Sequence, residues 1–434
     1  MTDIAARHSG AFGGNLHIAG FCRMLHARRN MDVSDNRLVR DGLRVLESRL
    51  PQGWVVRTVR NGAGTAGEFD ADATLTSPDR RTAVLVIEAR ERIEPNRVRV
   101  LIDTWRGAEQ RGVPMLVARY LSRRSRTLLR AAGASYLDLS GNVRLVVSEP
   151  GLFIETDGAD ADPDRQERPA RTLSGPKAGR IVRALVDHRQ PPGVRELASI
   201  TKLDPGYVSR VLTLLDKEAL IGRRPRRARR AAGGAPLPPA AVVRTERSAQ
   251  RARAMSSGPE VLIARDSAAD RTPLALTVSA SFIQWVDWPA LLRRWALDAP
   301  LASRGQTIMY LEPRGLAALV SRLAGATEPY AVSGGLAAAA IAPLAPPRMA
   351  LVWMRDAAMA ASRLGLRPTD AGANVMLIEP ADDVVFEGAV RRGGVWHAAP
   401  SQVVADLITS PGRGPAEAEE LIGWMQANEG AWRR

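Results

Sequence analysis

The stretch over residues 173–230 constrains the fold most, because it joins three short helical patterns to a dense arginine run. The third pattern opens with Asp204 and Pro205. Aspartate can cap a helix, and proline is tolerated at the first helical position. Apolar residues then recur at spacings of three and four, namely Val208, Leu212, Leu215 and Ala219. This spacing predicts an amphipathic helix over 205–220 with one face in a core.

The positions off the apolar face of this helix have side chains that suit DNA: Tyr207, Ser209, Arg210 and Lys217. Hydroxyls and backbone N–H groups at a helix N-terminus can meet phosphate, and an arginine can donate two hydrogen bonds to a guanine edge. A small helical bundle with a basic, solvated face would show the same pattern. The helix alone therefore does not decide between the two interpretations.

The arginine run that follows favours DNA, and it consists of Arg223, Arg224, Arg226, Arg227, Arg229 and Arg230. Such a block repels itself unless an anion neutralises it. Beside a helix of this kind the natural anion is the phosphate backbone, and binding should then weaken steeply with salt. Residues 231–240 are rich in Gly and Pro and predict a flexible tip, with a returning strand at 241–246. Three helices and a basic hairpin are typical of a winged helix-turn-helix, which we predict over 173–255.

The composition agrees with a nucleic-acid partner. A chain of 434 residues is long enough for several domains, and its formal net charge of +15 points to nucleic acid or another anionic surface. No apolar run approaches the ~18 residues that a membrane span needs. One cysteine, Cys22, and five histidines offer no zinc set. We therefore expect a cytoplasmic protein that binds double-stranded DNA, without a membrane, a metal or another cofactor.

The N-terminal part predicts an α/β domain over 32–156, between a disordered arm at 1–31 and a linker at 157–172 that lacks aliphatic residues larger than alanine. Asp72 begins one predicted strand, and Glu88 and Arg90 end the next. Positions i and i+2 of a strand share a face, so Glu88 and Arg90 point the same way. A hairpin is predicted near residues 136–145, where turn geometry accounts for Asp138 and Asn142.

The pattern of Asp72, Glu88 and Arg90 is similar to the PD-(D/E)xK core of restriction endonucleases, in which two acids hold Mg²⁺ and a lysine assists the attacking water. Arg90 stands where that family has lysine, and a guanidinium stays protonated. Two carboxylates are also a sparse set for Mg²⁺. We expect a nuclease-like fold without activity. The alternative is a Mg²⁺-dependent DNA endonuclease of a phage-defence system that uses these residues, and the plain interpretation is that they are polar residues at strand ends.

The C-terminal part, over 256–434, predicts a second mixed α/β domain. A strand ending in Ser333-Gly334-Gly335 runs directly into an alanine-rich helix. Backbone N–H groups at such a turn can approach an anion, so these three residues are a candidate anion-binding turn similar to that of nucleotidyltransferases. In an active transferase the next strand bears two metal-binding aspartates, whereas this one offers Asp356 alone. We expect no catalysis here, and tight strand–helix packing explains the glycines equally well.

Four segments in this order carry a wider resemblance: the winged helix, Val332-Ser-Gly-Gly-Leu-Ala, Ala373-Asn-Val-Met-Leu-Ile-Glu-Pro, and Pro400-Ser-Gln-Val-Val-Ala-Asp-Leu with its following Pro411-Gly-Arg-Gly. The chain resembles transcriptional regulators related to AbiEi-type antitoxins of type IV toxin–antitoxin systems. The resemblance implies a DNA-binding repressor with a non-catalytic, nucleotidyltransferase-like C-terminal domain. The N-terminal module goes beyond the minimal antitoxin architecture.

Taken together, the sequence predicts an α+β multidomain protein that is a sequence-specific transcriptional regulator and not an enzyme. The sequence leaves open whether the protein forms a homodimer and whether it responds to a small-molecule or protein effector.

Overall fold

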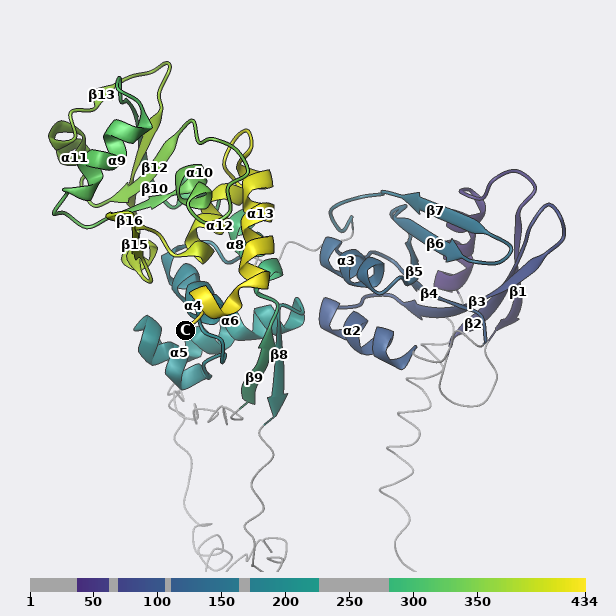
Figure 1. Ribbon diagram of the computed structural model, residues 1–434. Coiled ribbons are helices and arrows are strands. Elements are labelled where there is room, and N and C mark those ends of the chain that lie inside the picture. Colours follow the sequence, from purple (N-terminus) through teal and green to yellow (C-terminus); the bar gives the residue numbers. More distant parts are fainter. Residues whose placement is uncertain (1–36, 62–68, 106–110, 164–171, 226–280) are drawn as a thin grey trace, which may run out of the picture. The chain divides into compact units, whose positions relative to one another are not determined.

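The computed structural model describes residues 37–61, 69–105, 111–163, 172–225 and 281–434 (Figure 1). The predicted arm at 1–31 and most of the predicted wing lie outside these residues. Of the described residues, those up to Gly222 and those from Ile283 to Arg434 form one compact unit. Helices and strands are mixed along the described chain, which confirms the expected α and β content. None of the described helices is long and apolar enough to cross a membrane.

A curled, mixed sheet of seven strands forms the N-terminal region, and its strands lie in chain order (Figure 1). The central strands β3, β4 and β5 run parallel, and antiparallel strands flank them on both sides. The strands are β1 (Val55–Asn61), β2 (Ala71–Thr76), β3 (Thr82–Arg90), β4 (Val113–Ala118), β5 (Ser135–Asp138), β6 (Val143–Val147) and β7 (Leu152–Thr156).

Alternation along these strands divides their apolar residues between two cores. One core packs Ala73, Leu85 and Ile87 against Leu46 of a helix over residues 37–47. The other core packs Leu116 and further strand residues against two helices, α2 (Pro95–Thr104) and α3 (Arg123–Ala131). Because β3 and β4 are buried on both faces, their sequences are nearly continuous runs of apolar residues.

Three helices occupy the segment where the sequence predicts them, and we call this segment α4–α6: α4 (Pro176–Asp187), α5 (Val194–Thr201) and α6 (Pro205–Lys217). Two strands follow, β8 (Ile221–Pro225) and β9 (Ser281–Val286), and they pair in a two-stranded sheet. The backbone N–H of Asp287 donates to the carbonyl of Leu220 over 2.9 Å, which closes the base of this sheet. The returning strand predicted at 241–246 lies outside the described residues.

The C-terminal sheet is also mixed, and its seven strands follow the order β13-β10-β14-β12-β11-β16-β15. The strands are β10 (Gly305–Leu311), β11 (Tyr330–Ser333), β12 (Ala350–Met354), β13 (Arg367–Pro368), β14 (Val375–Pro380), β15 (Val390–Arg392) and β16 (Val395–His397). The α-helices of this region are α8 (Trp288–Asp298), α9 (Leu316–Ala324), α10 (Gly334–Ala339), α11 (Ala357–Arg363), α12 (Pro400–Ile408), α13 (Gly414–Ala427) and α14 (Glu429–Trp432).

One hydrophobic core runs from the α4–α6 segment into the C-terminal sheet. It joins Leu185 of α4 and Leu212 of α6 to Trp295 of α8, Trp353 of β12 and Val403 of α12. Helix α12 lies inside this core, and residues 400–407 are all buried. The three-helix segment is therefore built on the C-terminal sheet, since the two share their apolar interior.

Candidate nucleic-acid interface

The buried face of α6 is the one that the sequence predicts. Val208, Leu212 and Leu215 are fully buried. Val211, on the same side, is also buried. Asp204 caps the helix, because its Oδ1 accepts a hydrogen bond from the backbone N–H of Tyr207 over 2.9 Å. The amphipathic helix is confirmed, but it ends at Lys217 and not at residue 220. Ala219, with φ +51°, lies beyond the helix and is 1% exposed.

The opposite face of α6 is an open stripe, which we define as Gly206, Ser209, Arg210, Thr213 and Lys217. Spacings of three and four put these residues above one another on one side of the helix. Gly206 and Arg210 are exposed, and the other three residues are half-exposed. The sequence prediction missed Thr213, whose spacing of four from Ser209 could have revealed it. The Thr213 hydroxyl donates to the Ser209 carbonyl over 2.8 Å.

Tyr207 lies beside the open stripe and not on it. Its ring is half-buried against the core, and the Arg210 guanidinium carbon lies 5.9 Å from the ring centroid. Burial raises the pKa of the Tyr207 hydroxyl, while the charge of Arg210 opposes this rise. The hydroxyl is thus a neutral donor at pH 7, and the ring supports Arg210 through a cation–π contact.

Gly206 is exposed in the first turn of α6 and carries no side chain to cover the backbone there. A Cβ atom at this position would lie 2.9 Å from Oδ1 of Asp204, the atom that caps the helix. A larger residue here would press on the cap and cover the first turn. Glycine therefore keeps the helix start both capped and open.

Further cations are exposed on the α4–α6 segment, namely Lys177, Arg195 and Lys202. Within the described part of the chain none of the three forms an ion pair with a carboxylate. Of the predicted arginine run, Arg223 is half-exposed on β8. The side chain of Arg224, and the residues Arg226, Arg227, Arg229 and Arg230, lie outside what the structure describes.

Helix α4, which supports α6, is fastened to the C-terminal sheet by buried polar side chains. Arg183 of α4 is 1% exposed, and its Nε and Nη2 donate to Oδ2 of Asp187 over 3.1 and 3.0 Å. Its Nη1 donates to Oε1 of Gln402 on α12 over 2.9 Å. Gln402 in turn donates to Oδ1 of Asp406 over 2.8 Å. No local sequence pattern marks this cluster, because α4 and α12 are about 200 residues apart in the chain.

Asp406 is the centre of the cluster and is fully buried. Arg304 donates to its Oδ1 over 2.7 Å, while Ser333 and the Trp353 indole donate to its Oδ2 over 2.7 and 2.9 Å. A buried carboxylate needs this many donors to offset its lost hydration. The cluster is accordingly a structural one.

The predicted anion-binding turn has a different role in the structure. Ser333 is fully buried and donates its hydroxyl proton to Asp406. The carboxylate of Glu417 lies against Gly335, where a Cβ atom would be 2.6 Å from Oε2 of Glu417. Gly334 has φ +63°, which favours glycine, and its added Cβ would lie 3.1 Å from Leu351. The Ser333 hydroxyl is therefore not free to bind an anion, whereas Gly334 and Gly335 line an open cavity.

The predicted nuclease residues lie on one face of the N-terminal sheet. Asp72 on β2 is opposite Val86, so Glu88, two residues further along β3, is its diagonal neighbour. Glu88 is buried and forms an ion pair with Arg90. Arg90 also donates to Oδ2 of Asp70 over 3.0 Å, an acid that the sequence prediction did not include. Arg90 thus neutralises two carboxylates beside the predicted site.

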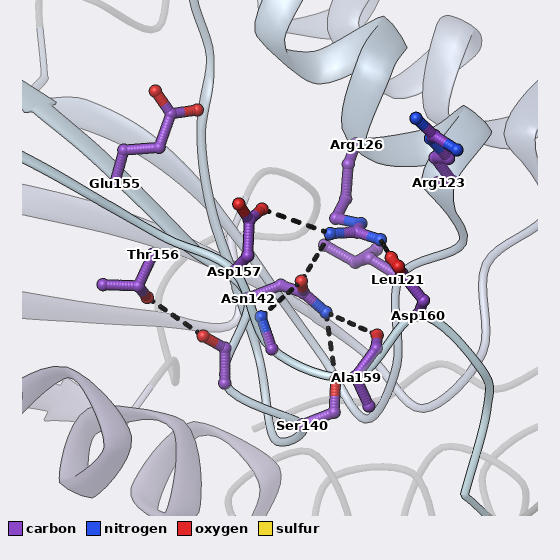
Figure 2. Close-up of polar contacts among 12 residues, drawn as sticks. Leu121, Arg123, Arg126, Ser140, Asn142, Glu155, Thr156, Asp157, Ala159 and Asp160 are labelled. Carbon is purple, nitrogen blue, oxygen red and sulfur yellow. Dashed lines mark hydrogen bonds and ion pairs between the residues drawn. The ribbon is translucent and has the colours of Figure 1, made fainter.

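The polar residues of the predicted hairpin support the fold. Asp138 is fully buried and accepts from the backbone N–H groups of Leu121, Ser140 and Asn142. Figure 2 shows Arg126 reaching from α3 toward Asn142, Asp157 and Asp160, while Arg123 lies apart from them. These contacts tie the hairpin to α3.

Among the described residues no group of three or more His, Cys, Asp or Glu could hold a metal ion.

Comparison with protein-family models, with curated proteins and with solved structures finds no match for this chain.

Proposed function

We propose that this chain is a sequence-specific regulator of transcription that binds double-stranded DNA through a winged helix-turn-helix formed by α4–α6 and the β8–β9 sheet. The observation that carries the proposal is the open stripe of α6, which presents hydroxyl and cationic side chains opposite a fully buried apolar face. A helix with one face fixed in a core and a short, polar, basic face outside is what major-groove reading requires.

The dimensions of α6 fit a major groove. Its 13 residues span about 20 Å, and a groove about 12 Å wide admits one helix. Arg210 is the candidate for a forked pair of hydrogen bonds to guanine, and Ser209 and Thr213 can meet base edges or phosphate. Lys217 forms a half-exposed ion pair with Glu94 over 2.8 Å, and a pair of this kind is weak enough for phosphate to replace the acid. Lys217 and the arginine run would then neutralise phosphates on either side.

The same proposal assigns the flanking regions supporting roles in a cytoplasmic, antitoxin-like repressor. The N-terminal sheet would be a nuclease-like module without activity, because Arg90 pairs with Glu88 and Asp70. The C-terminal sheet would be nucleotidyltransferase-like without catalysis. In support, Asp356, the first carboxylate after β12, caps α11 by accepting from the backbone N–H of Met359 over 2.8 Å.

The experiment is a salt series of duplex-DNA binding by fluorescence anisotropy, starting at low ionic strength. The slope of log K against log salt changes by about 0.9 for each phosphate that the protein neutralises, so replacing Arg226, Arg227 and Arg229 with glutamine should reduce it by about 2.7. Arg367→Gln, an exposed arginine on β13, is the matched control and should leave the slope unchanged. A purified protein that ignores duplex DNA at low salt would refute the proposal.

A further inference from the structure

A cavity of about 440 Å³ opens where α10, α12 and α13 meet β12 and β14. These three helices contact one another in the C-terminal region (Figure 1). The volume is in the range of pockets that bind small molecules, roughly 300–1,000 Å³. No part of the proposed DNA interface lines this cavity, so its ligand would be a separate molecule.

The cavity lies at the predicted anion-binding turn, since Gly334 and Gly335 line it, and the rest of its lining combines an apolar floor with cations. The floor consists of Met349, Leu351, Met376 and Leu407. Arg348 and Arg413 line the same cavity, together with one carboxylate, that of Glu417. Two guanidinium groups against one carboxylate leave a net positive charge beside an apolar surface.

Neither guanidinium group is held tightly by an acid. Arg348 is exposed, and within the described ranges it has no carboxylate partner. Arg413 donates to the carbonyl of Pro346 over 3.1 Å, and its Nε lies 4.0 Å from Oε1 of Glu417. Arginine recognises carboxylates, sulfonates and phosphates through its planar fork of donors. The cavity therefore has anion donors above a surface that would accept a ring or an alkyl chain.

Helix α12 connects this cavity to the α4–α6 segment. Leu407 and Ser410, at and just beyond its C-terminal end, line the cavity. At its N-terminal end, Ser401 donates to Asp187 over 2.5 Å and Gln402 accepts from Arg183, both on α4. Residues 400–407 are all buried in close packing. A shift at one end of this helix would therefore displace the residues at its other end.

We infer that this cavity binds a small organic anion with an apolar body, and that its occupant modulates DNA binding through α12 and α4. The binding site stands independently of any DNA contact. The modulating role rests on the function proposed above, and the experiment separates the two.

The probe is 1-anilinonaphthalene-8-sulfonate, an aromatic sulfonate that fluoresces in apolar surroundings, titrated into the full chain. We expect one saturable site, and about tenfold weaker binding for each of Arg348→Gln and Arg413→Gln. Arg367→Gln, an exposed arginine outside the cavity, should bind as the unaltered chain does. Equal binding by the Arg348→Gln/Arg413→Gln double variant and by Arg367→Gln would overturn the site.

The second arm measures the affinity for duplex DNA with and without saturating probe. We expect the probe to change the dissociation constant at least threefold in the unaltered chain and not in the Arg348→Gln/Arg413→Gln variant. By linkage, DNA should change the probe affinity by the same factor. Probe binding without any change in DNA affinity would overturn the modulating role, whereas absence of DNA binding without probe would overturn the proposed function instead.

Discussion

Replacing Arg183 with methionine should destabilise the chain strongly, because the arginine is 1% exposed and has no access to water. Methionine keeps most of the apolar stem but removes the guanidinium. Asp187 then becomes a buried carboxylate whose remaining side-chain donor in the described chain is Ser401. Gln402 Oε1 and the carbonyls of Val384 and Glu387 also lose this donor. Breaking one side of a buried ion pair costs about 3–5 kcal/mol, and we expect a decrease in the free energy of unfolding in that range.

The measurement is urea unfolding followed by tryptophan fluorescence, since Trp295 and Trp353 lie in the core shared with α4. Arg293→Met on α8 is the control. Its ion pair with Glu419 is exposed on both sides, so removing it should cost at most about 1 kcal/mol. Adding Asp187→Asn to the Arg183 variant should recover part of the stability by removing the stranded charge. A decrease below about 1 kcal/mol for Arg183→Met, or no recovery in the double variant, would contradict the role given to this cluster.

Three other side chains allow tests of the interface, the fold and the nuclease alternative. Arg210→Ala should weaken binding to a preferred sequence by about 1–3 kcal/mol and binding to random duplex only slightly, measured by anisotropy; equal effects on both would count against α6 as the reading helix. Burial and the charge of Arg392 lower the pKa of His397. As the pH falls, the imidazole is therefore protonated in the unfolded chain before it is protonated in the folded chain, and the stability should decrease below about pH 6.5. His397→Gln should flatten the decline in urea midpoint between pH 7 and 5, and an unchanged decline would show that another group is responsible. Plasmid incubated with the protein and Mg²⁺ or Mn²⁺ should stay intact, and nicking that Asp72→Ala abolishes would restore the nuclease alternative.

Local patterns predicted local structure well. The spacing of Val208, Leu212 and Leu215 located α6 and its buried face, and Asp204 located its cap. Those features depend on residues within a few positions of one another, where helix periodicity and capping act. Even here the side-chain directions needed the structure, because Tyr207 turned out to flank the open stripe that Thr213 helps to form.

Contacts between distant segments were not predictable from these patterns. Residues 281–286 were assigned to the C-terminal domain, without a predicted strand, yet they form β9 and pair with β8. Ser333 was a candidate for anion binding because of the glycines beside it. Its hydroxyl instead donates a hydrogen bond to Asp406, 73 residues away in the chain. A lone aspartate in an apolar helix gives no indication of its partners, and only the fold brings its donors together.

The position of α4 determines how far the reading helix can act alone. Leu185 of α4 packs in the same core as Leu212 of α6, while Arg183 and Asp187 of α4 are bonded to α12. Moving α4 away from α12 would strand buried charge, which is far more costly than sliding one apolar surface over another. The helix proposed to read DNA is therefore tied to the C-terminal sheet through its support. We therefore expect changes at α12 to affect α6 through α4, without any contact of their own with DNA.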